Sequence, residues 1–306
     1  MFARAIRSEI SLLKKYLNLD PSKSSSNSSN HILTYVWFDS KLRLIRSKTV
    51  KYSRNQGEKL TIEEIPIITI KDELVLTPVR IYRDPFRVVL NDVHNSENYL
   101  VLCSDDSHND IRTTLIDSVR KLEALFKNVR VSIEQMVTMI DAQTGRPLDW
   151  PKNGFPGPEG PYYCGVGTGR CHGRSAAEAH YQTCLFAGVR VVSLQPQSML
   201  SQWSWEVIGG DESHGTDLMS LVDDVWMSRY IAQRVAEDFA IEINYESKPV
   251  PGKWTCSRSV IKVVIDKRVE LNLTHIEQLQ KVIAMAGDFS FRDFADWTID
   301  FVEIQL

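Results

Sequence analysis

The segment from Trp150 to Gly167 constrains the fold more than any other part of the chain. It contains five glycines and four prolines. Glycine weakens helices and strands, and proline removes a backbone donor and breaks a helix, so this segment cannot form a helix or a central strand. By composition alone it is a stiff surface loop.

The size and composition of the chain are those of a globular protein with one large domain or two of ordinary size. Its 306 residues are 43% apolar and 25% charged, with a net charge of −3. That charge gives no reason to expect nucleic acid or an anionic membrane as a partner, and no apolar run approaches the ~18 residues of a membrane span. Five cysteines without a secretory signal indicate free thiols in a reducing compartment.

Apolar periodicity divides the rest of the chain into helices and strands. Helices are expected over residues 3–19, 111–126, 175–188, 216–239 and 275–286. Strands are expected over residues 32–39, 42–47, 74–82, 99–103, 129–140, 189–193, 241–245 and 260–266. Strands interleaved with helices indicate an α+β or α/β domain.

Several blocks of the sequence resemble the eukaryotic-type glutamine synthetases over about residues 31–265. The loop described above matches the signature of that family. The other matching blocks are Arg83–Arg87, Glu178–Gly188, Trp226–Phe239 and Lys248–Trp254. These blocks consist of turns, caps and apolar faces, so they specify a fold rather than a reaction.

The resemblance implies an α+β fold with a small β-grasp-like N-terminal domain and a larger catalytic-type domain around a curved antiparallel sheet. We therefore expect residues 1–30 to form a helix and a Ser-rich linker, residues 31–108 the β-grasp-like domain, and residues 109–306 the catalytic-type domain. The N-domain Asp-Gly-Ser-Ser loop and the C-terminal flap of the family have no counterpart here. The expected second domain is therefore incomplete, and the chain is expected to be a C-terminally truncated paralogue.

The reaction of the family joins glutamate to ammonium with ATP, and it needs Mg²⁺ or Mn²⁺ held mainly by carboxylates. The resemblance places the first pair of metal ligands at Glu134 and Met136, so one carboxylate remains and a thioether replaces the other. At two later ligand positions of the family, this chain has Gln197 and Ser204. Val260 stands where the family has its histidine.

Glu206 is the candidate replacement for a lost metal ligand. It lies two residues beyond Ser204, and side chains two apart on a strand point to the same face. Glu134 is then a vestigial ligand position, and we assign no catalytic residue. No resident cofactor is expected, and Mg²⁺ or Mn²⁺ with ATP is implied only if the family activity survives.

Two other groups of residues have simpler structural explanations. His180 lies inside an expected helix, so we interpret it as a buried, hydrogen-bonded histidine rather than a metal ligand. Cys164, Cys171 and His172 do not have the spacing of a common zinc site and lack a fourth ligand. Ordinary free thiols are therefore expected at both cysteines.

The leading hypothesis is a catalytically inactive glutamine synthetase homologue that serves as a scaffold or regulatory subunit of a glutamine synthetase oligomer. Members of the family form rings with active sites shared between subunits, so a defective subunit can join an active relative. The alternative is an active ATP-dependent glutamate–ammonia ligase that makes glutamine. A third hypothesis is a decaying gene product, which predicts an insoluble protein.

Glu9 interrupts the basic start of the chain, so the cytoplasm is expected rather than the mitochondrion.

Overall fold

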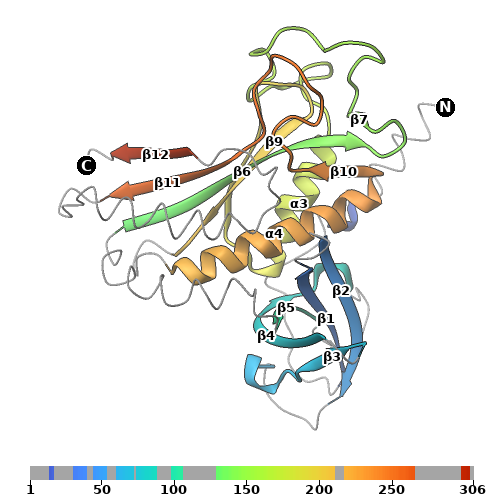
Figure 1. Ribbon diagram of the computed structural model, residues 1–306, viewed down its shortest axis with the longest axis vertical. Helices are drawn as coiled ribbons and strands as arrows, with labels where there is room; N and C mark the ends of the chain where they lie inside the picture. Colours follow the sequence, from blue (N-terminus) through green and yellow to red (C-terminus); the bar gives the residue numbers. More distant parts are fainter. Residues whose placement is uncertain are drawn as a thin grey trace.

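The computed structural model of the protein contains two β-sheets with helical packing between them. The described residues are 14–16, 30–39, 44–53, 60–71, 74–87, 98–105, 129–210, 217–265 and 298–303. Within these ranges one sheet has five strands in the order β2-β1-β5-β4-β3, and the other has seven. Figure 1 shows the five-stranded sheet at one end of the molecule, with helix α4 between it and the larger sheet.

The five-stranded sheet is built from the N-terminal third of the chain. Its strands are β1 (Asn30–Asp39), β2 (Leu44–Ser53), β3 (Ile68–Ile70), β4 (Leu74–Arg83) and β5 (Tyr99–Asp105), with short 3₁₀ helices η1 (Ile62–Glu64) and η2 (Pro85–Arg87). Leu33, Tyr35 and Val101 are fully buried in its core. The four strands predicted in this region are confirmed, and β2 extends further than expected.

The seven-stranded sheet is organised around β6, which pairs with four other strands. Its members are β6 (Val129–Asp141), β7 (Arg146–Pro147), β8 (Val191–Pro196), β9 (Gln202–Ile208), β10 (Ile241–Asn244), β11 (Ser259–Ile265) and β12 (Thr298–Glu303). Strands β7, β9, β10 and β11 all run antiparallel to β6. The predicted strands that correspond to β6, β8, β10 and β11 are confirmed.

The prediction of an antiparallel sheet is wrong at one edge, because β12 pairs parallel to β11. Parallel neighbours need a connection of about a dozen residues or more, and residues 266–297 separate these two strands. The larger sheet is therefore mixed. Strand β9 is absent from the strands expected by apolar periodicity, although Trp203, Trp205 and Val207 alternate with polar residues along it. Its extended backbone is the geometry that the placement of Ser204 and Glu206 on one face requires.

Helices α3 (Arg174–Ala187) and α4 (Leu218–Asp238) confirm two of the predicted helices. Helix α3 begins after Gly173, which has a φ of 77°. A Cβ at this position would lie 2.4 Å from the Met139 sulfur, so both the conformation and the packing require glycine. The helix ends at Gly188, whose left-handed conformation is the predicted C-terminal cap.

Both helices pack on one face of the larger sheet. The shared core includes Ile133, Val137, Ala179, Trp203, Trp205, Val225 and Ile231. Alternate residues of β6 and β9 enter this core, so the residues between them point to the opposite face.

Of the predicted N-terminal helix, residues 14–16 are helical, whereas the helices expected over residues 111–126 and 275–286 lie outside the described residues.

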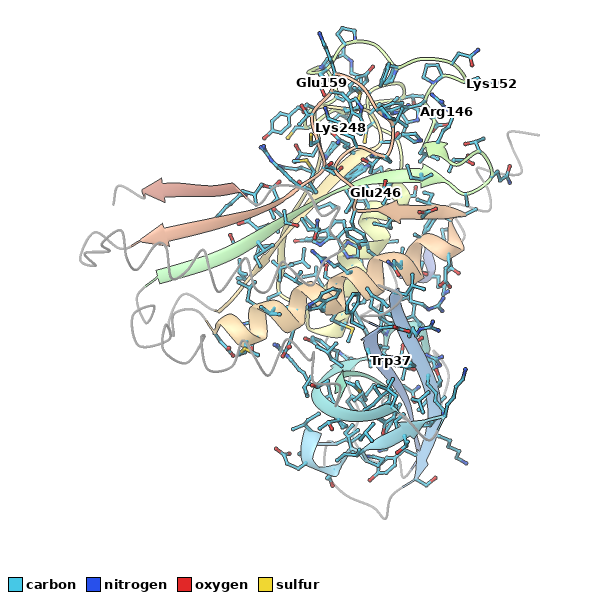
Figure 2. All side chains as sticks on the ribbon, in the orientation of Figure 1. Trp37, Arg146, Lys152, Glu159, Glu246 and Lys248 are labelled. Atoms are coloured by element: carbon cyan, nitrogen blue, oxygen red, sulfur yellow. The ribbon has the colours of Figure 1, made fainter. Side chains whose placement is uncertain are left out.

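The Pro- and Gly-rich segment is irregular, as its composition predicts, and a small hydrophobic cluster anchors it. That cluster comprises Trp150, Tyr162, Met199, Leu200 and Trp254. Glu159 accepts a hydrogen bond from the Thr255 hydroxyl at 3.1 Å, which ties this loop to a second one. Figure 2 shows the labelled Glu159 and Lys248 at the end of the molecule opposite Trp37.

No helix in the described part of the chain is long and apolar enough to cross a membrane.

Candidate functional site

The strand register gathers the predicted ligand positions on one face of the larger sheet. Glu134 of β6 lies opposite Glu206 of β9 on one side and opposite Val260 of β11 on the other. Met136 lies opposite Ser204. Directly opposed residues point to the same face. The neighbours of these residues along β6 and β9 that enter the helix-covered core are Ile133, Val137, Trp203, Trp205 and Val207. The five positions therefore share the face that points away from α3 and α4.

Glu134 is buried and receives hydrogen bonds from three neutral side chains. Its Oε1 accepts from Gln195 Nε2 at 3.2 Å, Gln197 Nε2 at 3.2 Å and Ser204 Oγ at 2.6 Å. Gln197 Nε2 also donates to Ser204 Oγ at 2.7 Å. Two positions where the resemblance implies metal ligands therefore direct donors at the remaining carboxylate.

Lys262 supplies a positive charge to both carboxylates of this face. Its Nζ lies 3.0 Å from Glu134 Oε2 and 2.9 Å from Glu206 Oε2. Burial by itself lowers the pKa of this ammonium, but hydrogen bonds and charges of Glu206 and Glu134 outweigh that effect and raise the pKa above its ordinary value. The ammonium therefore stays charged at neutral pH.

Glu206 is held by donors on neighbouring strands as well as by the lysine. Ser132 Oγ donates to its Oε1 at 2.5 Å, and Ser193 Oγ lies 3.5 Å from its Oε2. We refer to the residues that meet here as the Glu134 cluster: Ser132, Glu134, Ser193, Gln195, Gln197, Ser204, Glu206 and Lys262. The cluster carries two carboxylates and one ammonium. Each of the four carboxylate oxygens lies within hydrogen-bond distance of a serine, glutamine or lysine donor.

The remaining two positions of this face are apolar. Met136 and Val260 are both buried, at 5% and 3% exposure. A thioether is a poor ligand for hard cations and an aliphatic side chain is no ligand at all. These residues close the face around the cluster rather than extending it.

This donor set does not fit the divalent cations that the family chemistry implies. Mg²⁺ and Mn²⁺ bind several oxygen ligands that are free to accept the metal. Here Gln197 and Ser204 donate to Glu134, and a lysine ammonium lies between the two carboxylates. The predicted metal roles of Glu134 and Glu206 remain predictions, while their position on one shared face is observed.

His180 is buried in α3, as predicted. Its Nε2 lies 3.2 Å from the carbonyl oxygen of Ser228, and burial lowers its pKa to about 4 against a smaller raising effect of that hydrogen bond. The imidazole is therefore neutral at physiological pH. Its surroundings are those of a structural histidine in the core.

The cysteines are free thiols, as the sequence indicated. The side chain of His172, the residue after Cys171, pairs with Asp149 at 2.6 Å. Among the described residues, no group of three or more histidines, cysteines or acids is arranged to hold a metal ion.

Lys262 belongs to the site although neither the family resemblance nor a motif points to it, and the strand pattern alone carries its signal. Lys262 lies two residues beyond Val260, so strand periodicity directs it to the same face as the position of the family histidine. Ser132 precedes Glu134 by two residues and follows the same rule. Gln195 lies opposite Ser204 on β8, a pairing that no local sequence pattern reveals.

Comparison with curated proteins finds glutamine synthetases. The chain is 34% identical over 255 residues to a glutamine synthetase of Panulirus argus, a match that covers 79% of this chain and 65% of that protein. It is 32% identical over 300 residues to a glutamine synthetase of Emericella nidulans, covering 87% of this chain and 76% of that protein. It is 35% identical over 235 residues to glutamine synthetase 2 cytoplasmic of Drosophila melanogaster, covering 72% of this chain and 59% of that protein.

No family model matches the chain. The chain spans less than two thirds of the length of the Panulirus and Drosophila proteins.

Proposed function

Because the chain belongs to the glutamine synthetase family, we propose that it is a homologue that has lost the glutamate–ammonia ligase reaction and works as a non-catalytic subunit. The observation that carries this proposal is the reversal of hydrogen-bond polarity around Glu134. Gln197 and Ser204 donate to the carboxylate where the family pattern has ligands that accept a metal.

The chemistry of the reaction explains why this reversal matters. Phosphoryl transfer depends on positioning and on cations that neutralise the charge of the phosphates. Groups that act together in such a site are strongly non-additive, so the loss of several removes most of the rate enhancement. Two carboxylates that already accept hydrogen bonds from neutral donors and share one lysine ammonium do not provide the divalent site.

The layout of the chain supports a subunit that keeps a packed scaffold. We assign residues 31–108 to a β-grasp-like domain and residues 109–306 to an incomplete catalytic-type domain, preceded by a helix and a Ser-rich linker over residues 1–30. The packed core of α3, α4 and the larger sheet supports this assignment, because it retains the structural blocks of the family. The chain can then take part in a ring of glutamine synthetase subunits without contributing chemistry to it.

We place this role in the cytoplasm and in the control of glutamine biosynthesis. The support is the name of the Drosophila relative, which is a cytoplasmic glutamine synthetase.

The catalytic part of the proposal is tested by an assay of γ-glutamyl transfer with Mn²⁺ or Mg²⁺ and nucleotide, beside an active family member. We expect no turnover above the no-enzyme control from a folded, soluble sample. Turnover that disappears in Glu134→Ala would establish the alternative, an active ATP-dependent ligase. Glu178→Gln, on the exposed side of α3, is the matched control for a change of one carboxylate.

The subunit part of the proposal is tested by co-expression with an active glutamine synthetase that carries a different affinity tag. We expect both chains in the same oligomer after tandem purification, and a changed specific activity per active subunit. Strictly separate oligomers would contradict the role in assembly. An insoluble chain would favour the hypothesis of a decaying gene product.

A further inference from the structure

The ammonium of Lys262 occupies the point where the two carboxylates of the Glu134 cluster converge. It lies 3.0 Å from Glu134 Oε2 and 2.9 Å from Glu206 Oε2. We propose that Lys262 is a tethered cation that takes the place of a divalent metal ion, and that removing its charge turns this face into a divalent-cation site. The inference deepens the proposed function, since it names what replaced the metal.

The geometry of the sheet explains how a lysine reaches this point. Lys262 lies opposite Ser132, which is two residues from Glu134 on the same face of β6. Diagonal neighbours across paired strands are about 7–8 Å apart, within reach of a long side chain. Glu206 lies opposite Glu134 on the far side of β6, so the lysine extends across the central strand to meet both acids.

The two carboxylates are oriented by other groups, so they would remain in place without the lysine. Glu134 Oε1 is held by Ser204 at 2.6 Å, and Glu206 Oε1 by Ser132 at 2.5 Å. The second oxygen of each acid is the one that contacts the ammonium. Two carboxylate oxygens aimed at one point are the beginning of a site for a hard cation.

The lysine and a divalent cation cannot share these oxygens. Mg²⁺ binds carboxylate oxygens at about 2.0–2.1 Å, closer than the ammonium lies now, so both cations would stand side by side at the same two atoms. Like charges at that separation repel strongly, and the part-buried position limits screening by water. Lys262 has 26% of its side chain exposed, and Glu134 has 11%.

The inference predicts that metal binding depends on the charge of one side chain. In the folded full-length chain, Mn²⁺ binding is measured by the electron paramagnetic resonance signal of free Mn²⁺. We expect Lys262→Met to bind one Mn²⁺ at least about tenfold more tightly than the wild type, a difference of one decade in Kd. Methionine keeps the length of the side chain and adds no ligand for a hard cation.

The control variants separate the charge of Lys262 from other effects. Lys152→Met removes an exposed lysine from the Pro- and Gly-rich loop and is expected to bind Mn²⁺ as the wild type does. Lys262→Arg keeps the charge and is also expected to match the wild type. The double variant with Lys262→Met and Glu206→Gln is expected to lose the added binding, because one of the two converging carboxylates is gone.

Equal Mn²⁺ affinity of the wild type and Lys262→Met would overturn the inference. If Lys262→Met fails to fold, the wild type still decides the matter: tight Mn²⁺ binding that Glu206→Gln weakens would overturn the inference, and weak binding insensitive to Glu206→Gln would support it. The outcome is distinct from the catalytic test. Turnover by the wild type would refute the proposed loss of activity, whereas the Mn²⁺ titration reports on Lys262 alone.

Discussion

Two charge clusters in this molecule have the same arrangement with the signs of the charges reversed. On the helix side of the larger sheet, the carboxylate of Asp224 lies between two arginines, with Arg190 Nε at 2.8 Å and Arg80 Nη2 at 3.2 Å. On the opposite face, the ammonium of Lys262 lies between two carboxylates, Glu134 and Glu206. Each cluster places one charge between two of the opposite sign.

The clusters differ in the burial of the central charge and in what they connect. Asp224 is fully buried on α4, and its partners Arg80 and Tyr82 come from β4 of the other sheet. In the Glu134 cluster the central charge, Lys262, is 26% exposed, and the cluster joins strands whose backbones are already hydrogen-bonded to one another. The first cluster therefore links separate parts of the fold, whereas the second can change its chemistry with less effect on stability. A scaffold can persist while a site on one of its faces is replaced.

The largest effect is expected from Asp224→Ala. Removing this fully buried carboxylate takes the shared partner from two arginines that are 26% and 29% exposed and takes the acceptor from the buried Tyr82 hydroxyl, which costs about 3–5 kcal/mol of the free energy of unfolding. The free energy is measured by urea unfolding followed by tryptophan fluorescence. Asp224→Asn, which keeps the shape and removes the charge, is expected to lose a similar amount. A loss below about 1 kcal/mol would mean that the two clusters contribute alike.

His180, on the helix side of the larger sheet, is expected to lower the free energy of unfolding of the protein in mild acid. Its folded pKa of about 4 lies below the unfolded value of about 6.5, so the unfolded chain binds the proton first. Stability is full above the unfolded pKa and falls as the pH drops from about 6.5 to about 4, by roughly 3 kcal/mol. In His180→Gln this part of the pH dependence is expected to disappear. An unchanged slope in unfolding experiments across that range would contradict the assignment of a neutral buried imidazole.

A smaller effect is expected from Lys262→Met on the opposite face. The variant leaves two carboxylates near each other, but their partial exposure and their serine and glutamine donors reduce the loss to about 1–2 kcal/mol. Millimolar Mn²⁺ is expected to recover part of this loss by binding the folded state. Thermal melts with and without Mn²⁺ measure both quantities. A loss as large as that of Asp224→Ala would remove the distinction between the two faces.

The smallest effect is expected from Glu178→Gln on the exposed surface of α3. Its carboxylate lies 3.6 Å from Arg174, and both side chains are nearly half exposed. Such pairs contribute about 0.5 kcal/mol or less. Urea unfolding that resolves a loss above about 1 kcal/mol would show that even exposed pairs matter to this fold.

The sequence predicted those elements whose signals are local. Gly188 marks the end of α3, and the alternating pattern of β6 and the apolar stripe of α4 identify a strand and a helix without knowledge of their partners. The parallel edge formed by β12 could not be predicted, because strand direction depends on a connection between distant segments. The position of Gln195 beside Glu134 depends likewise on the pairing of three strands.

The sequence by itself determined the family of the chain and the residue types at the former ligand positions, because blocks of residues in order and spacing can be recognised without coordinates. It showed that Met136, Gln197, Ser204 and Val260 are not the expected ligands. Only the tertiary structure decided what these changes did together. The side chain of Lys262 reaches Glu134 and Glu206 because three strands stand side by side, and hydrogen-bond direction and charge balance exist only once those strands are paired.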